Sequence, residues 1–277
     1  MPGPVVAITH GPDPETLVRD ALELVDAQAA IKREGRVVLK PNYVEPRSPA
    51  DGVTTDPRII AALVRWLKGL GCRHITIAES NWSRANTERA FELVGLPALA
   101  SDLGVRLLNL FDDEHVPLEI PGALSLHRVR IARTVLEADC LVNLPKLKRH
   151  CLADVTLGIK NLMGAVFPEK SAMHRDLHQR LRDLATVLRP ALTVVDGIVG
   201  SERHETAGTP VRMDLVIAGL DPVATDAVGC LVMGVDPGEV EHLRLAAEAG
   251  LGEVRPERIA VRGVPVARVR RPFLPAR

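Results

Sequence analysis

Lysine is rare in this chain of 277 residues, and the places where it is kept are the first pointer to chemistry. Of 35 basic residues only seven are lysines, so arginine serves wherever a generic positive charge is enough. Lys146, Lys148, Lys160 and Lys170 nevertheless lie within 25 residues of one another. A desolvated lysine can lose its proton and act as a base, whereas a guanidinium keeps its proton. Chance and codon bias are the alternative, but the clustering favours a catalytic site.

The segments NLPKLKRH (143–150) and TLGIKNLMG (156–164) combine three of these lysines with His150 and Asn161. Ammonium groups that converge on one crevice repel each other unless an anion lies among them. We therefore expect a small anionic substrate, a carboxylate or a phosphate. A solvated basic loop is the alternative, and the apolar residues between the charges argue against it.

Polar residues also follow the ends of predicted strands. Lys40 ends the apolar run RVVLK, and the proline after it turns the chain out of the sheet. Ligands of parallel sheets bind in a crevice at the carboxyl ends of the strands, so Lys40 and Asn42 are expected at the rim of that crevice. Glu79, Asn143 and Asp196 occupy like positions after other apolar runs. One such residue would usually be a helix cap, but several together favour a shared site.

Two histidines and two aspartates are candidates for a divalent metal. His174 and His178 are four residues apart in MHRDLHQRL and would share one face if the helix begins that early, as in helical two-histidine metal sites. Surface histidines are the alternative, because HExxH is absent. Asp221 has the features of a helix N-cap followed by proline. Asp226, one turn later among small apolar residues, should be buried and paired with a lysine or a metal, and Asp196 completes the candidate set.

The chain lacks the signatures of several cofactors. Cys72, Cys140, Cys151 and Cys230 are far apart and form no CxxC pair, so we expect buried core thiols rather than zinc or iron–sulfur ligands. GxGxxG, GxxxxGK[ST] and GxSxG are also absent. We therefore expect neither an iron–sulfur cluster nor a flavin in this chain, and a divalent metal is the one cofactor left open.

Apolar runs of strand length alternate with amphipathic segments of helix length. The strands are expected at 5–10, 36–42, 74–80, 106–111, 140–144, 192–198, 213–219 and 258–264, and the helices at 15–31, 57–71, 86–96, 175–189, 222–234 and 237–252. Continuous Val, Ile and Leu in the strands indicate a sheet covered on both faces. The fold class predicted is α/β, a mostly parallel Rossmann-like sheet with helices on both faces and an inserted β-hairpin at 116–120 and 126–131.

The domain organisation expected is a single α/β domain over residues 1–265 and a basic tail at 266–277, loose or docked. Two packed lobes with a boundary near 112–135 are the alternative. Lys+Arg and Asp+Glu both total 35, which argues against a protein that coats nucleic acid or a membrane. Since the start lacks a signal-peptide pattern and no long apolar stretch follows, we expect a cytoplasmic protein.

The motifs VLKPNYV, GVTTDPRIIAALVRWL, VNLPKLKRH, LGIKNLMG, VVDGIVGSE and LDPVATDAVGCLVMG, in this order, resemble the domain of unknown function 362 family over about residues 36 to 252. Members of that family often carry an appended ferredoxin-like iron–sulfur module. By the resemblance the positions carried over are Lys40, Asn42, Thr55, Lys146, Lys148, His150, Lys160, Asn161, Asp196, Glu202 and Asp226. Two departures are the charged SERHETAGTP after the VDGI strand and the missing iron–sulfur cysteines.

Proton transfer at carbon in a small anionic metabolite, as in an isomerase, a racemase or a lyase, is the leading hypothesis. The catalytic set expected is Lys160 as base, His150 as a second acid or base, and Lys146 as an anion ligand. The substrate-binding set expected is Lys40, Asn42, Thr55, Asn143, Lys148, Asn161 and Glu202, with the two asparagines Asn42 and Asn161 as donors to an oxyanion. Two alternatives are a redox accessory protein that works with a separate ferredoxin or flavoprotein, and a non-catalytic anion-binding protein. A homodimer is left open.

Overall fold

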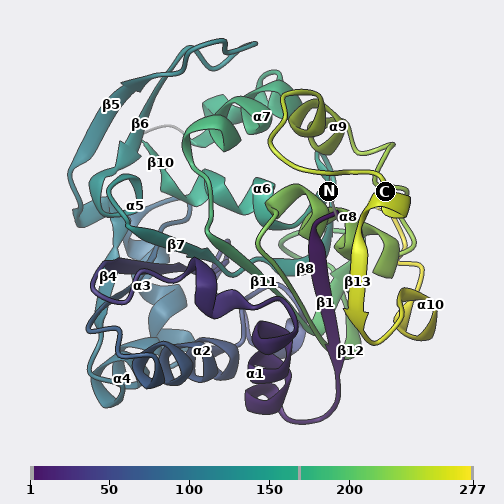
Figure 1. Ribbon diagram of the computed structural model, residues 1–277. Coiled ribbons are helices and arrows are strands. Elements are labelled where there is room, and N and C mark those ends of the chain that lie inside the picture. The colour runs from purple at the N-terminus through teal and green to yellow at the C-terminus, as the bar shows by residue number, and fades with distance from the viewer. Residues whose placement is uncertain (1–2, 168–169, 276–277) are drawn as a thin grey trace.

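The computed structural model describes residues 3–167 and 170–275. The strands of its main sheet are β1 (Val5–His10), β2 (Arg36–Lys40), β3 (His74–Glu79), β4 (Arg106–Asn109), β7 (Cys140–Asn143), β11 (Leu192–Glu202), β12 (Thr209–Gly219) and β13 (Ala260–Gly263). They lie in the order β13-β1-β12-β11-β7-β2-β3-β4 (Figure 1). Neighbours along this path are parallel except at β12, which is antiparallel to β1 and β11. The prediction of a mostly parallel α/β sheet is confirmed.

Helices cover both faces of this sheet, as the sequence predicts. They are α1 (Pro14–Leu24), α2 (Pro57–Gly69), α3 (Arg84–Leu93), α4 (Leu96–Asp102), α5 (Arg133–Leu136), α6 (Gly158–Asn161), α7 (Leu177–Val187), α8 (Pro222–Val232), α9 (Glu241–Glu248) and α10 (Val266–Val269). One apolar core contains the inward side chains of α1 to α4, and a second contains those of α6 to α9. In Figure 1, α1, α2 and α4 lie below the sheet and α6, α7 and α9 above it.

Helix starts follow from local capping chemistry. Asp221 accepts hydrogen bonds from the amides of Val223 and Ala224, with Pro222 at the first helical position of α8, so the predicted N-cap is confirmed. The same arrangement of aspartate followed by proline begins α1 and α2. These caps fix the residue at which each of the three helices begins.

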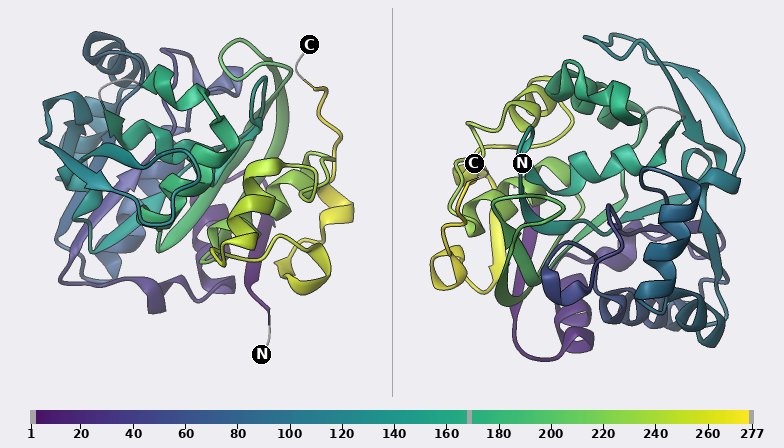
Figure 2. Two further views of the ribbon diagram at one scale, coloured as in Figure 1. Left: turned by 90° about the horizontal axis from the view of Figure 1, so that it is seen from above. Right: turned by 180° about the vertical axis from the view of Figure 1, so that it is seen from behind.

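The predicted hairpin is present as β5 (His115–Glu119) and β6 (Arg128–Ala132). Together with β10 (Val166–Phe167), which pairs with β6, it forms an antiparallel sheet separate from the main one. Figure 2 shows this hairpin at one end of the molecule and β13 at the other. The 3₁₀ turn Leu162–Ala165 separates β10 from α6, so only a few residues lie between α6 and the strand that pairs with the hairpin.

Three local predictions were wrong. No strand was predicted at residues 146–150, but they form β8 (Lys146–His150), which pairs with β11 and with β9 (Asp154–Thr156). The helix expected from 175 begins at Leu177, because Asp176 has a left-handed φ of 49°. A short helix, α4, follows α3 where the sequence analysis expected none. Alternating charges hid the strand character of β8.

The C-terminal segment is docked against the end of α8 and the end of β11. The amide of Phe273 donates to the carbonyl of Met233, and the Phe273 ring is 5% exposed. The amide of Leu274 donates to the Glu202 carboxylate, while its carbonyl accepts from the amide of Arg203. These contacts hold the turn that follows β11. Within residues 3–167 and 170–275, none of the helices has the length and apolar character needed to cross a bilayer.

Candidate functional site

A cavity of about 610 Å³, part of it open to solvent, lies at the carboxyl ends of β2 and β3. Its walls come from the loops after these strands, from β8 and β9, and from the segment that contains α6. The residues that line it are Asn42, Tyr43, Val44, Glu79, Ser80, Asn81, Trp82, Lys148, His150, Thr156, Lys160, Asn161, Met163, Gly164, Lys170, His174 and Glu205. Eight of the residues singled out from sequence are in this wall: Asn42, Glu79, Lys148, His150, Lys160, Asn161, Lys170 and His174.

Lys40 lies beneath the cavity and is neutralised by Glu79. Its Nζ is 3.0 and 2.9 Å from the two carboxylate oxygens, and both side chains are buried. Burial lowers the pKa of Lys40, and the Glu79 charge opposes that shift. Lys40 is therefore a structural cation that orients Glu79, rather than a free ligand for a substrate anion.

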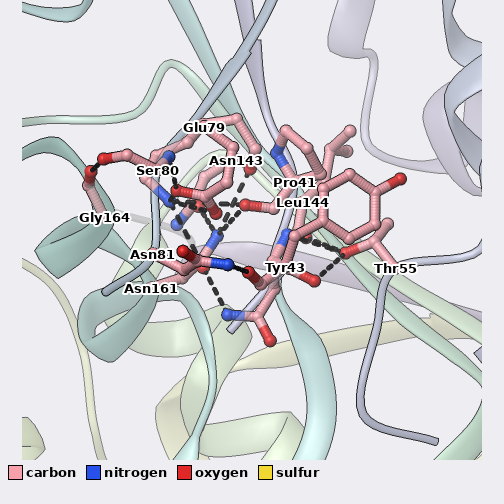
Figure 3. Close-up of polar contacts among 12 residues, drawn as sticks. Pro41, Tyr43, Thr55, Glu79, Ser80, Asn81, Asn143, Leu144, Asn161 and Gly164 are labelled. Atoms are coloured by element: carbon pink, nitrogen blue, oxygen red, sulfur yellow. Dashed lines mark hydrogen bonds and ion pairs between the residues drawn. The ribbon is translucent and has the colours of Figure 1, made fainter. Parts of the chain in front are cut away.

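Three asparagines, Asn42, Asn143 and Asn161, hold the loops around this pair together, and the last two are labelled in Figure 3. The amide nitrogen of Asn161 donates to Asn143 Oδ1 at 2.8 Å and to the carbonyls of Lys40 and Pro41 at 3.3 Å. Asn42 Nδ2 donates to Asn161 Oδ1 at 2.8 Å, and Asn143 Nδ2 donates to the carbonyl of Gly158 at 2.8 Å. The Asn161 amide is used up by these contacts, so it has no donor left for an oxyanion, and Asn42 keeps one.

Lys146 and Asp196 form a second buried ion pair. They face each other in the register of β8 and β11, with Nζ 2.7 Å from Oδ2. The Asp196 carboxylate also accepts the amides of Asp56 and Ile198. Neither side chain lines the cavity. The expected anion-ligand role of Lys146 and metal role of Asp196 are therefore not supported, because each charge is already satisfied by the other.

Lys148 and Lys170 are held by neutral oxygens. Lys148 Nζ donates to the carbonyls of Val53 and Glu205 at 3.0 and 3.1 Å, and burial, with the nearby Lys160 charge, lowers its pKa to about 7. Lys170 Nζ donates to Ser80 O, Ser80 Oγ and the carbonyl of Gly164, and burial lowers its pKa to about 7. Lys170 has all three ammonium protons engaged, whereas Lys148 has one left.

Lys160 differs from these four lysines. Within the described residues its ammonium makes neither a hydrogen bond nor an ion pair, although it lines the cavity and is only partly exposed. Burial lowers its pKa to about 8. It lies on the one-turn helix α6, whose first amides, Gly158 N and Ile159 N, donate to Asp226 at 2.7 and 2.9 Å. Asp226 is thus an anchor for α6, and burial raises its pKa to about 7.

His150 is buried as a neutral side chain. Its Nδ1 accepts the amides of Leu152 and Ala153 at 3.0 and 3.2 Å, so the ring proton is on Nε2. Burial, with the Lys160 charge, lowers its pKa to about 3. The imidazole can donate a hydrogen bond through Nε2–H, but it cannot take up a proton near neutral pH without losing its backbone contacts. The expected role as a second acid or base is therefore reduced to that of a neutral donor.

One group of potential metal ligands is found among the described residues, formed by His150, Cys151 and Glu205 with ligand atoms within 4.8 Å of one another. Cys151 is exposed, contrary to the expectation that all four cysteines are buried, and its Sγ donates to Glu205 at 3.4 Å. The lone pair of His150 Nδ1 points at two amides rather than at a free position. This group fits a metal poorly.

The four predicted metal ligands are not brought together. His174 precedes α7, at the end of the 3₁₀ turn Lys170–His174, and stacks on Trp82, with ring centroids 6.2 Å apart. His178 lies in α7 against His242, Nδ1 to Nδ1 at 3.3 Å. The break at Asp176 between them prevents the shared helix face on which the metal proposal depended. The two aspartates, Asp196 and Asp226, are engaged as described above.

Thr55 and Glu202, both carried over by resemblance, lie outside the cavity wall. Thr55 Oγ1 accepts a hydrogen bond from the backbone amide of Asn42 and donates one to the carbonyl of Leu144, so it supports the loop that contains Asn42. Glu202 holds the C-terminal segment. Sequence reasoning did not single out Glu205 or Trp82, and it counted Lys170 among the clustered lysines without giving it a role in the site.

Comparisons with known proteins found similar sequences and a matching family. "Thylakoid-associated protein sll1697" of Synechocystis sp. (strain ATCC 27184 / PCC 6803 / Kazusa) is 26% identical over 247 residues, 82% of this chain and 72% of the relative. The lactate racemase apoprotein from Thermoanaerobacterium thermosaccharolyticum aligns with 89% of this chain at a TM-score of 0.42 and 12% identity, and the alignment spans 57% of that protein's length. The model of the domain of unknown function 362 (DUF362) matches residues 37–231, most of the chain and all of the motifs around the cavity. The chain belongs to the DUF362 family.

Proposed function

We propose that this protein is an enzyme that binds a small carboxylate- or phosphate-bearing metabolite and transfers a proton at one of its carbon atoms. The observation that carries the proposal is the contrast between Lys160 and the other lysines of the site. Lys40 and Lys146 are paired with carboxylates, and Lys148 and Lys170 with neutral oxygens. Lys160 alone among these five faces the cavity without a polar partner in the described residues.

The charge of the cavity supports an anionic ligand. Lys148, Lys160 and Lys170 line it, and Glu79 is already neutralised by Lys40. Glu205, which accepts hydrogen bonds from Cys151, is the one other carboxylate of the wall as described. An anion that enters would offset this positive excess and would raise the pKa of each nearby ammonium. Ligand binding and protonation of the lysines should therefore be coupled.

The proposed reaction uses different groups for binding and for chemistry. Lys148 has one ammonium proton left for the anion, and the free amide proton of Asn42 and Nε2–H of His150 are neutral donors for charge that develops on oxygen. A lysine with a pKa of about 8 is partly neutral near pH 7 and can accept a proton from carbon. Lys160 is assigned as that base.

Exchange with heavy water tests the proposal. The protein is incubated in D₂O with a panel of carboxylates and phosphate esters that have a C–H next to a carbonyl or carboxyl group, and loss of that proton signal is followed by NMR. Wild type and the exposed-lysine control Lys68→Met should exchange at least one compound, and Lys160→Met should exchange none. Exchange that persists in Lys160→Met would remove the assignment of the base. Absence of exchange with every compound that binds would favour a non-catalytic binding protein.

A further inference from the structure

The wall of the cavity is chemically mixed, because an indole, an imidazole and two apolar side chains line it beside the lysines. The lysines account for recognition of one charged group only. The side chains on the rest of the wall indicate the chemistry of the part of the ligand that they would contact.

Trp82 is the most informative of these side chains. It lines the cavity, follows the end of β3, and is 49% exposed, although a large aromatic side chain is normally buried more completely. The His174 ring lies nearly parallel to it, at 22°, and also lines the cavity. Val44 and Met163 add apolar surface to the same wall. Flat aromatic surface is thus available in the cavity that contains the unpaired lysine.

Building on the proposed function, we propose that the ligand is an anion that carries a flat unsaturated ring, an aromatic or heteroaromatic carboxylate, whose ring stacks on Trp82 while its carboxylate lies among the lysines. Aromatic rings prefer offset stacks with other rings, and such contacts stabilise beyond simple burial of area. A saturated ring of similar size would bury similar apolar area but would not stack. Planarity is therefore the property that separates this inference from mere hydrophobic contact.

Three acids of graded structure serve as probes: benzoate has a flat ring, cyclohexanecarboxylate has a puckered ring of similar size, and acetate has none. Their affinities are measured by calorimetry on wild type, Trp82→Ala, Trp82→Phe and Lys160→Met. Trp66→Phe leaves Trp82 as the one tryptophan of the chain, so quenching of its fluorescence reports contact with the ring directly.

Benzoate should bind wild type about three- to tenfold more tightly than cyclohexanecarboxylate. Trp82→Ala should abolish this difference, Trp82→Phe should keep part of it, and benzoate should quench the Trp66→Phe protein. Equal affinities for the two ring acids on wild type, or an unchanged preference in Trp82→Ala, would overturn the ring inference. In that case loss of acid binding in Lys160→Met would leave the anion site itself supported. If none of the three acids binds wild type, both this inference and the anionic ligand are wrong.

Discussion

The ammonium of Lys40 and the carboxylate of Glu79 form a two-point ion pair beneath the cavity, with Nζ 3.0 and 2.9 Å from the two oxygens and both side chains buried. They come from the ends of the neighbouring strands β2 and β3. The pair is therefore part of the framework that shapes the cavity, and removing either partner leaves a buried charge uncompensated.

We predict that Lys40→Met and Glu79→Gln will each lower the free energy of unfolding by about 3–5 kcal/mol, because one charge of a buried pair is left without its partner. The double variant should lose much less than the sum of the two, since no unpaired charge remains. Urea denaturation of the four proteins measures this. Additive losses would mean that the two side chains are stabilised independently.

Replacing Lys160 with arginine shows whether this side chain acts as a base or only as a positive charge. Lys160→Arg keeps the positive charge, so binding of a small carboxylate should stay within about threefold of wild type. Proton exchange into the bound compound should be lost, because a guanidinium does not give up its proton at working pH. Lys68→Arg, at an exposed helical position, is the control and should leave both quantities unchanged. Full exchange activity in Lys160→Arg would contradict the role of a base.

The lowered pKa values of the buried lysines predict a particular dependence of stability on pH. Lys148 and Lys170 have folded-state pKa values of about 7 against an ordinary 10.5. Between these values the unfolded chain binds more protons, so the folded state is favoured as pH rises from about 7 towards 10, and this stability is lost as pH falls through 7.

Melting temperatures between pH 6.5 and 9.5 test this dependence, and the rise should be smaller in Lys148→Met and in Lys170→Met than in wild type. The difference between each variant and wild type is the quantity to compare, because other groups titrate in the same interval. If the melting temperature rises with pH as steeply in both variants as in wild type, neither lysine has a lowered pKa.

Asp226 should position Lys160 without contacting the ligand. Its two oxygens accept the amides that begin α6, and Asp226→Asn replaces one acceptor by a donor that faces a donor. We expect a loss of about 1–3 kcal/mol in unfolding free energy and a fall in the rate of proton exchange. The pH at which exchange reaches half its maximum should also shift, because the surroundings of Lys160 change. A stability loss with an unaltered pH profile would indicate a purely structural role.

Phe273 should stabilise the turn that carries Glu205. Its buried ring packs within the second core, and the residue after it is bonded to Glu202 and Arg203. Phe273→Ala should lower the free energy of unfolding by about 3–5 kcal/mol, whereas Leu274→Ala, at an exposed side chain, should change it by less than about 0.5 kcal/mol. Thermal or urea unfolding distinguishes the two. Equal effects would mean that the ring does not anchor the segment.

The fold was predictable because its signals are local. Continuous apolar runs mark β1, β2, β3 and β7, and an aspartate followed by proline marks the start of α1, α2 and α8. Burial on both faces and capping of free amides depend on residues close together in the chain. The strand at 146–150 was not predicted because its lysines are buried by partners far away in sequence, which no local pattern reveals.

From the sequence alone came the mostly parallel sheet, the inserted hairpin, the family resemblance and the clustering of the rare lysines in one segment. Only the tertiary structure decided which lysine is available. Lys40 and Lys146 resemble Lys160 in sequence, yet each meets a carboxylate from another strand, 39 and 50 residues away, whereas Lys160 meets none in the described residues. The structure also decided that His174 and His178 do not share a helix face, because Asp176 between them has a left-handed backbone. The physical reason is that a charge in a low-dielectric interior is governed by the few ångströms around it, and those neighbours are set by how distant strands pack.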